Sequence, residues 1–80
     1  MSKIIIYSTP SCMACRSTQN QFSKQNIDVV KVDLSQDQVS FDRLVSMGYS
    51  AAPIVEIIDG DQVVDIWSGF RPDKISQFSN

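Results

Sequence analysis

The first third of the chain carries the pattern that most restricts its fold. Lys3–Tyr7 is rich in β-branched and aromatic residues and predicts a buried strand, and Asp28–Asp33 predicts a second one. Between them, a helix is expected from near Cys12 to about Asn26. A strand, a helix and a strand within about thirty residues form a βαβ unit, which makes the two strands parallel with a right-handed crossover.

A second helix is expected in the middle of the chain. Ser35 is followed three residues later by Gln38, which is a capping-box signature. The apolar positions after it keep helical spacing through Leu44, and Gly48 is well placed to end the helix.

The last third predicts a hairpin and a short helix. Pro53–Ile58 and Gln62–Trp67 are expected to be antiparallel strands, because an Asp-Gly pair between them is a strong turn signal. Pro72 suits the first turn of a final helix, whose Ile75 and Phe78 should face the sheet. The complete order is βαβαββα, an α/β arrangement in which a four-stranded mixed sheet is flanked by three helices. Periodicity alone leaves several α+β folds open, and the position of the two cysteines narrows them.

Length and composition indicate one ordinary globular domain spanning residues 1–80. The chain is 42% hydrophobic and 20% charged, which argues against disorder. Its net charge of −2 and the lack of a basic patch argue against nucleic-acid binding. The apolar run near the N-terminus is too short for a membrane span or a signal peptide, and a small secreted protein usually carries more than one disulfide, so we expect a cytoplasmic location. We also expect a monomer.

The only two cysteines, Cys12 and Cys15, lie at the junction between the first predicted strand and the first predicted helix. In a βαβ unit this loop lies at the carboxyl edge of the sheet, where ligands usually bind. Unpaired N–H groups and the helix dipole favour a thiolate on Cys12 and lower its pKa from about 8.5 toward neutrality. Arg16 adds a nearby cation. Cys15 follows one turn later, within reach for a disulfide.

Such a pair can be a redox couple, part of a metal site or a structural clasp. A zinc site needs four ligands, and this chain has two cysteines and no histidine. A disulfide that closes a four-residue loop removes little chain entropy, so it is a weak staple. The residues therefore favour a redox couple. Cys12 is expected to attack a substrate disulfide, and Cys15 to resolve the mixed disulfide.

Three stretches resemble the thioredoxin superfamily in its short glutaredoxin form: YSTPSCMACR, the mid-chain AAPIV and the hairpin that follows. In addition, Trp67–Asp73 reads WSGFRPD. This segment resembles the signature of NrdH-redoxins, the glutaredoxin-like electron donors of class Ib ribonucleotide reductases. The resemblance covers essentially the whole chain and implies a thioredoxin/glutaredoxin-like fold.

The resemblance also implies how the site works. Cys12 and Cys15 would alternate between a dithiol and a redox-active disulfide. The Ala52–Pro53 peptide bond would be cis, opposite the cysteines, with backbone near Ala52 pairing with an incoming peptide. Electrons would pass to the large subunit of a class Ib ribonucleotide reductase. Thioredoxin reductase, a flavoenzyme, would recharge the pair, so NADPH and FAD would act only indirectly and no cofactor would be bound.

The expected partner-binding residues flank the cysteines or lie in the two other matching segments. They are Met13, Ala14, Arg16, Ala52, Pro53, Trp67, Ser68, Gly69, Phe70 and Arg71. Trp67 and Phe70 fit a core role as well as an apolar contact to the reductase, and Arg71 is expected to pair with Asp73 and set the loop. Ala14 departs from the family, which often has a polar residue at this position. The dipeptide between the cysteines can tune the stability of the thiolate and hence the reduction potential of the pair.

Two other functions stay open on the sequence. Glutaredoxins that depend on glutathione usually carry C-P-Y/F-C and a Gly-Gly with an acidic pair after the last strand. Here the corresponding residues are Met13-Ala14 and Ser68–Arg71, so the usual glutathione pocket is not expected. The chain start also resembles arsenate-reductase-like regulators that contact RNA polymerase, which would make it a redox-sensing binding protein. Those chains carry a helical insertion and lack WSGFRPD.

Overall fold

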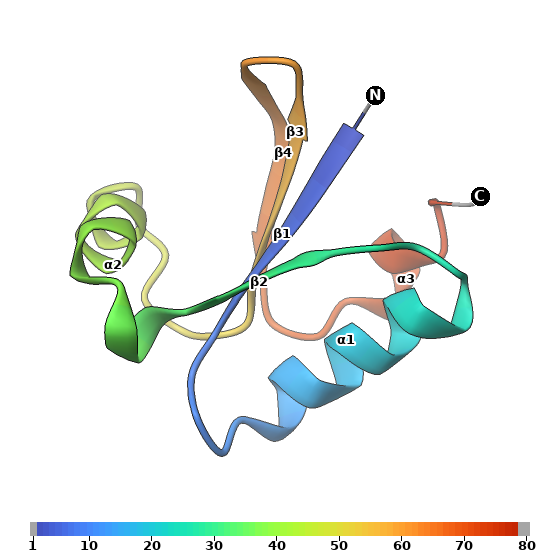
Figure 1. The fold of residues 1–80 in the computed structure, drawn as a ribbon, viewed down its shortest axis with the longest axis horizontal. Coiled ribbons are helices and arrows are strands. Elements are labelled where there is room, and N and C mark those ends of the chain that lie inside the picture. Colours follow the sequence, from blue (N-terminus) through green and yellow to red (C-terminus); the bar gives the residue numbers. More distant parts are fainter. Residues whose placement is uncertain (1, 79–80) are drawn as a thin grey trace.

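The computed structural model describes residues 2–78, which form one four-stranded mixed sheet flanked by helices (Figure 1). The strands are β1 (Ser2–Ser8), β2 (Val30–Asp33), β3 (Ile54–Asp59) and β4 (Gln62–Ser68). The helices are α1 (Met13–Lys24), α2 (Gln38–Ser46), α3 (Pro72–Ile75) and a 3₁₀ turn, η1 (Leu34–Gln36). The sheet order is β2-β1-β3-β4, with β1 parallel to β2 and the other pairs antiparallel. The predicted fold is confirmed.

The two faces of the sheet are covered unequally. Alternate residues of each strand point to opposite faces, which divides the apolar side chains into two clusters. On one face α1 and α3 lie side by side (Figure 1) and bury Ile4, Ile6, Phe22, Val55, Ile57, Trp67 and Ile75. On the other face Leu44 of α2 and Leu34 of η1 pack over Ile5, Tyr7 and Ile54 of the sheet.

The strand register brings three loops to one edge of the sheet. Tyr7 near the end of β1 pairs with Ile54 at the start of β3, and Ile54 pairs with Ser68 at the end of β4. The β1–α1, α2–β3 and β4–α3 loops therefore meet at this edge, although they are far apart in sequence.

The first helix is shorter than predicted. It ends at Lys24, because Asn26 already has a φ of 59° in the left-handed region, which asparagine tolerates better than most residues. The second strand begins at Val30 rather than at Asp28, because only Val30 and the residues after it are in register with β1.

The predicted capping box of Ser35 with Gln38 is wrong. Asp33 caps the 3₁₀ turn by accepting the Ser35 N–H at 2.9 Å, so the chain makes an additional turn before α2 begins. Asp37 is the N-cap of α2 and accepts the Ser40 N–H at 3.0 Å and its hydroxyl at 2.9 Å. The hydrogen bonds from Ser40 hold the pKa of Asp37 below its ordinary value.

The remaining boundaries agree with the sequence. β3 and β4 lie within one residue of their predicted bounds. Gly48, just after α2, has a φ of 96°, which suits glycine. Pro72 opens α3, Ile75 is buried, and the Phe78 ring stacks on the Trp67 ring with centroids 6.3 Å apart. None of the helices in residues 2–78 is long and apolar enough to cross a membrane.

Candidate active site

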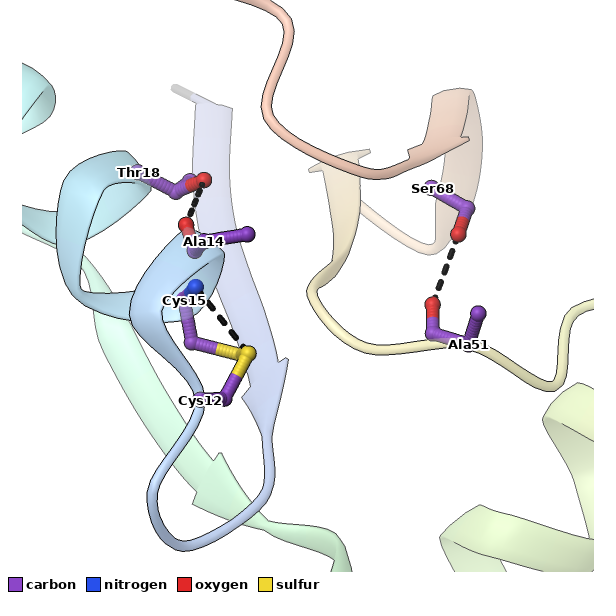
Figure 2. The surroundings of a disulfide bond; sticks show 6 residues. All are labelled: Cys12, Ala14, Cys15, Thr18, Ala51 and Ser68. Atoms are coloured by element: carbon purple, nitrogen blue, oxygen red, sulfur yellow. Dashed lines mark hydrogen bonds between the residues drawn. A yellow bond between two sulfur atoms is a disulfide. The ribbon is translucent and has the colours of Figure 1, made fainter.

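Cys12 and Cys15 form a disulfide at the point where the chain leaves β1 and enters α1 (Figure 2). Their Cα atoms are 5.2 Å apart. Cys12 precedes the first residue of α1 and is half-buried, whereas Cys15 lies in the first turn with only 3% of its surface exposed. The difference in exposure makes Cys12 the sulfur that a substrate can reach, with Cys15 directly behind it.

The sulfur of Cys12 is also the N-cap of α1. It accepts the backbone N–H of Cys15 at 3.1 Å, in the position usually held by a serine or aspartate oxygen (Figure 2). This N–H has no partner inside the helix, and it belongs to the positive end of the helix dipole. After reduction, a thiolate at Cys12 can accept the same N–H in a stronger, charge-assisted hydrogen bond.

The residues around the two sulfurs differ in exposure. Met13 is 73% exposed and presents an apolar side chain beside the disulfide, Arg16 is exposed, and Ala14 is half-buried. One turn further along α1, the fully buried Thr18 donates its hydroxyl to the Ala14 carbonyl at 2.8 Å (Figure 2). A shallow cavity of about 160 Å³ adjoins the disulfide. It is lined by Ser8, Thr9, Ser11, Cys12, Cys15, Arg16 and Gln19.

The loop before Cys12 contains an unusual backbone conformation. Ser11 has a φ of 62°, in the left-handed region that non-glycine residues seldom adopt. The chain turns sharply here between β1 and α1, and the turn places Cys12 at the helix tip.

The α2–β3 loop faces the disulfide from across the site. The Ala52–Pro53 bond is cis, as the resemblance implied, and Pro53 is buried. Ser68 at the end of β4 donates its hydroxyl to the Ala51 carbonyl at 2.6 Å, and Figure 2 shows both residues on the side opposite the cysteines. The Gly69 N–H donates to the Pro53 carbonyl at 2.8 Å. The beginning of the WSGFRPD segment therefore holds this loop in place.

Two aromatic residues of the WSGFRPD segment have different surroundings. Trp67 is 4% exposed and belongs to the core, with Phe78 on its ring and the ammonium of Lys74 5.1 Å from the ring centroid. Its side chain therefore serves packing rather than surface contact. Phe70 is 39% exposed and remains available to a partner.

Arg71 and Asp73 form the expected local pair. The Arg71 guanidinium donates to both carboxylate oxygens of Asp73, at 3.1 and 2.9 Å. This hydrogen bonding raises the pKa of Arg71 and lowers that of Asp73. The pair lies at the start of α3 and fixes the β4–α3 loop.

Sequence reasoning missed a polar cluster on the α2 face. Glu56, in the middle of β3, is only 1% exposed and accepts the Tyr7 hydroxyl at 2.8 Å. Arg43 of α2 donates to both Glu56 oxygens at 3.1 Å and to the Tyr7 oxygen at 2.9 Å. Burial and then the Glu56 hydrogen bond raise the pKa of Tyr7 to about 12. The available signal was a lone acid inside an apolar strand, because a buried carboxylate requires a hydrogen-bonding or ionic partner.

No group of three or more histidine, cysteine, aspartate or glutamate side chains in residues 2–78 is arranged to hold a metal ion. The polar side chains at the site come from serine, threonine, glutamine and a single arginine.

Comparison with known proteins agrees with this geometry. A glutaredoxin-like 8.6 kDa protein in the rubredoxin operon of Clostridium pasteurianum is 36% identical over 75 residues, covering 92% of this chain and 93% of the relative. The glutaredoxin-like protein NrdH of Salmonella typhimurium is 34% identical over 76 residues, covering 92% of this chain and 85% of the relative.

A solved structure is similar along nearly the whole chain. The NrdH-redoxin of Escherichia coli, described as a glutaredoxin-like protein with a thioredoxin-like activity profile, superposes with a TM-score of 0.83. It is 28% identical in sequence, and the match covers 98% of this chain and 96% of the other. The family model for glutaredoxin matches residues 4–63. The chain therefore belongs to the glutaredoxin family and resembles the NrdH-redoxins within it.

Proposed function

We propose that this protein is a dithiol–disulfide oxidoreductase that donates electrons to a class Ib ribonucleotide reductase and is recharged by thioredoxin reductase. The observation that carries the proposal is the half-buried Cys12 at the tip of α1, bonded to the buried Cys15 behind it. The resemblance to NrdH-redoxins supports the two partners, which are the large subunit of the ribonucleotide reductase and thioredoxin reductase.

The reaction transfers two electrons in two exchange steps. The Cys12 thiolate attacks one sulfur of a substrate disulfide, which forms a mixed disulfide and releases the first substrate thiolate. The Cys15 thiolate then attacks the Cys12 sulfur and releases the second substrate thiolate. The substrate ends as a dithiol and the protein as the Cys12–Cys15 disulfide. NADPH and FAD belong to the reductase that reverses this oxidation, so the chain itself binds neither.

The residues around the sulfurs support a protein disulfide as substrate rather than glutathione. The dipeptide between the cysteines is Met13-Ala14, and the loop after β4 contains Phe70 and Arg71 where glutathione-binding relatives carry small and acidic residues. A monomer in the cytoplasm fits this role, because thiols are kept reduced there.

Coupled assays test the proposal. We expect NADPH consumption with insulin as substrate when thioredoxin reductase is supplied, and little when glutathione and glutathione reductase replace it. Activity only in the glutathione mixture would favour a glutathione-dependent glutaredoxin, and activity in neither would favour a redox-sensing binding protein. As a control on the roles of the thiols, Cys15→Ser should trap a mixed disulfide with insulin, whereas Cys12→Ser should trap none.

A further inference from the structure

Two members of the polar cluster of Tyr7, Arg43 and Glu56 lie on either side, in sequence, of the loop that faces the disulfide. Arg43 and Glu56 are 13 positions apart in the sequence, and their ion pair joins the two ends of this stretch. The stretch contains the end of α2 and the loop with Ala52 and Pro53. Its two ends are thereby held at a fixed distance from each other.

The same cluster reaches the other half of the site. Tyr7 is the residue of β1 that pairs with Ile54, directly after Pro53, and β1 leads into the loop that carries Cys12. Arg43 donates to Tyr7 of β1 as well as to Glu56 of β3, so one guanidinium connects α2 to the two strands whose adjoining loops form the site. The two-pronged hydrogen bonding to the carboxylate fixes orientation as well as distance.

Few other contacts hold α2 against the sheet. Leu44 is its only buried residue, whereas Val39 is 81% exposed and Val45 is 43% exposed. The ion pair is open to solvent on the arginine side, because the Arg43 side chain is 42% exposed whereas that of Glu56 is 2% exposed, so it adds little net stability over apolar groups of similar size. The polar groups therefore contribute a defined geometry that apolar packing alone would not specify.

We propose that Arg43, Glu56 and Tyr7 are positioning residues that set the Ala52–Pro53 loop for protein substrates. This inference rests on the proposed function. A protein disulfide must lie along this loop while Cys12 attacks it, whereas a small disulfide needs only the exposed sulfur. Loosening the cluster should thus raise KM for a protein disulfide without changing the chemistry at the cysteines.

The test compares two probes with the full-length, prereduced protein. Tyr7→Phe/Arg43→Leu/Glu56→Leu replaces the whole cluster with apolar groups, leaves no buried charge and keeps the net charge unchanged. Oxidation by insulin is followed at a series of insulin concentrations, and oxidation by dithiobis(nitrobenzoate) by absorbance. Ile57→Val, on the opposite face of the sheet, is the control for a purely destabilising change. Arg43→Met/Glu56→Gln is the second variant and serves if the triple variant does not fold, because it removes both charges together and the amide at position 56 can still accept the Tyr7 hydroxyl.

We expect the KM for insulin to rise about tenfold, with the limiting rate and the dithiobis(nitrobenzoate) rate constant within about twofold of wild type. An unchanged KM in the folded variant would overturn the proposal, and so would an equal loss with both probes or the same KM change in Ile57→Val. A wild-type protein that reacts with dithiobis(nitrobenzoate) but never with insulin would instead refute the proposed function, and this inference with it.

Discussion

Reducing the Cys12–Cys15 disulfide should destabilise the fold only slightly. The bond joins residues with a sequence separation of 3, so it closes a four-residue loop. Closing so short a loop lowers the entropy of the unfolded chain by about 6 cal/mol/K, which corresponds to about 2 kcal/mol at 25 °C. In the reduced protein, a Cys12 thiolate at the positive end of α1 recovers about 0.3–1 kcal/mol of this difference. The oxidised form should therefore be more stable by about 1–2 kcal/mol.

Urea unfolding of both forms at pH 7 measures this difference. With a slope of about 1 kcal/mol/M, typical of a small domain, the two midpoints should differ by about 1–2 M with equal slopes. Cys12→Ser/Cys15→Ser is the matched control, because serine at position 12 keeps an N-cap acceptor without a thiolate. A gap of about 4 kcal/mol or more, or a reduced form that does not fold, would show that the disulfide is a structural staple. The redox interpretation would then be wrong.

Two further predictions concern side chains away from the disulfide. Gln25 donates its amide to the carbonyl of Ile75, the last residue of α3, and to that of Phe78 three residues later. Gln25→Leu should therefore lower the free energy of unfolding by about 1–2 kcal/mol, measured by thermal denaturation. An unchanged melting temperature would mean that apolar packing alone keeps α3 in place. Because the pKa of Tyr7 is raised to about 12 in the folded state, its contribution is complete below about pH 10 and is lost as the pH rises toward 12. Urea midpoints of wild type and Tyr7→Phe should converge over this interval, and a constant difference would contradict the argument.

The order of the elements and the pairings of β1 with β2 and of β3 with β4 could be predicted from the sequence, because its strongest signals are local and agree with one another. The βαβ unit, the Asp-Gly turn and Pro72 each determine one connection, and together they leave a single order of elements. The start of α2 could not be predicted in this way. Ser35 and Asp37 are both good caps, and the choice depends on how much chain is needed to cross from the sheet edge to the helix.

The site, like the fold, has a part that could be predicted from the sequence and a part that could not. Cys12 and Cys15 were found because their spacing and their place in the βαβ unit are features of the sequence itself. Arg43 and Glu56 were not, because their contact depends on the register of β3 and on the direction in which α2 crosses the sheet. Only Glu56 could have been noticed from the sequence, because a charged residue in a buried strand needs a partner. The sequence does not indicate which cation is that partner.

The left-handed conformation of Ser11 limits how the active-site loop can diversify. Glycine, asparagine and aspartate adopt this conformation most readily, whereas most other residues, including the serine found here, lose about 1–2 kcal/mol in it and β-branched residues fit it worst. The dipeptide Met13-Ala14 has helical backbone and is free of this restriction. Evolution or a designed library can therefore tune reactivity between the cysteines over a wide range of residues, while the position just before Cys12 accepts only a few.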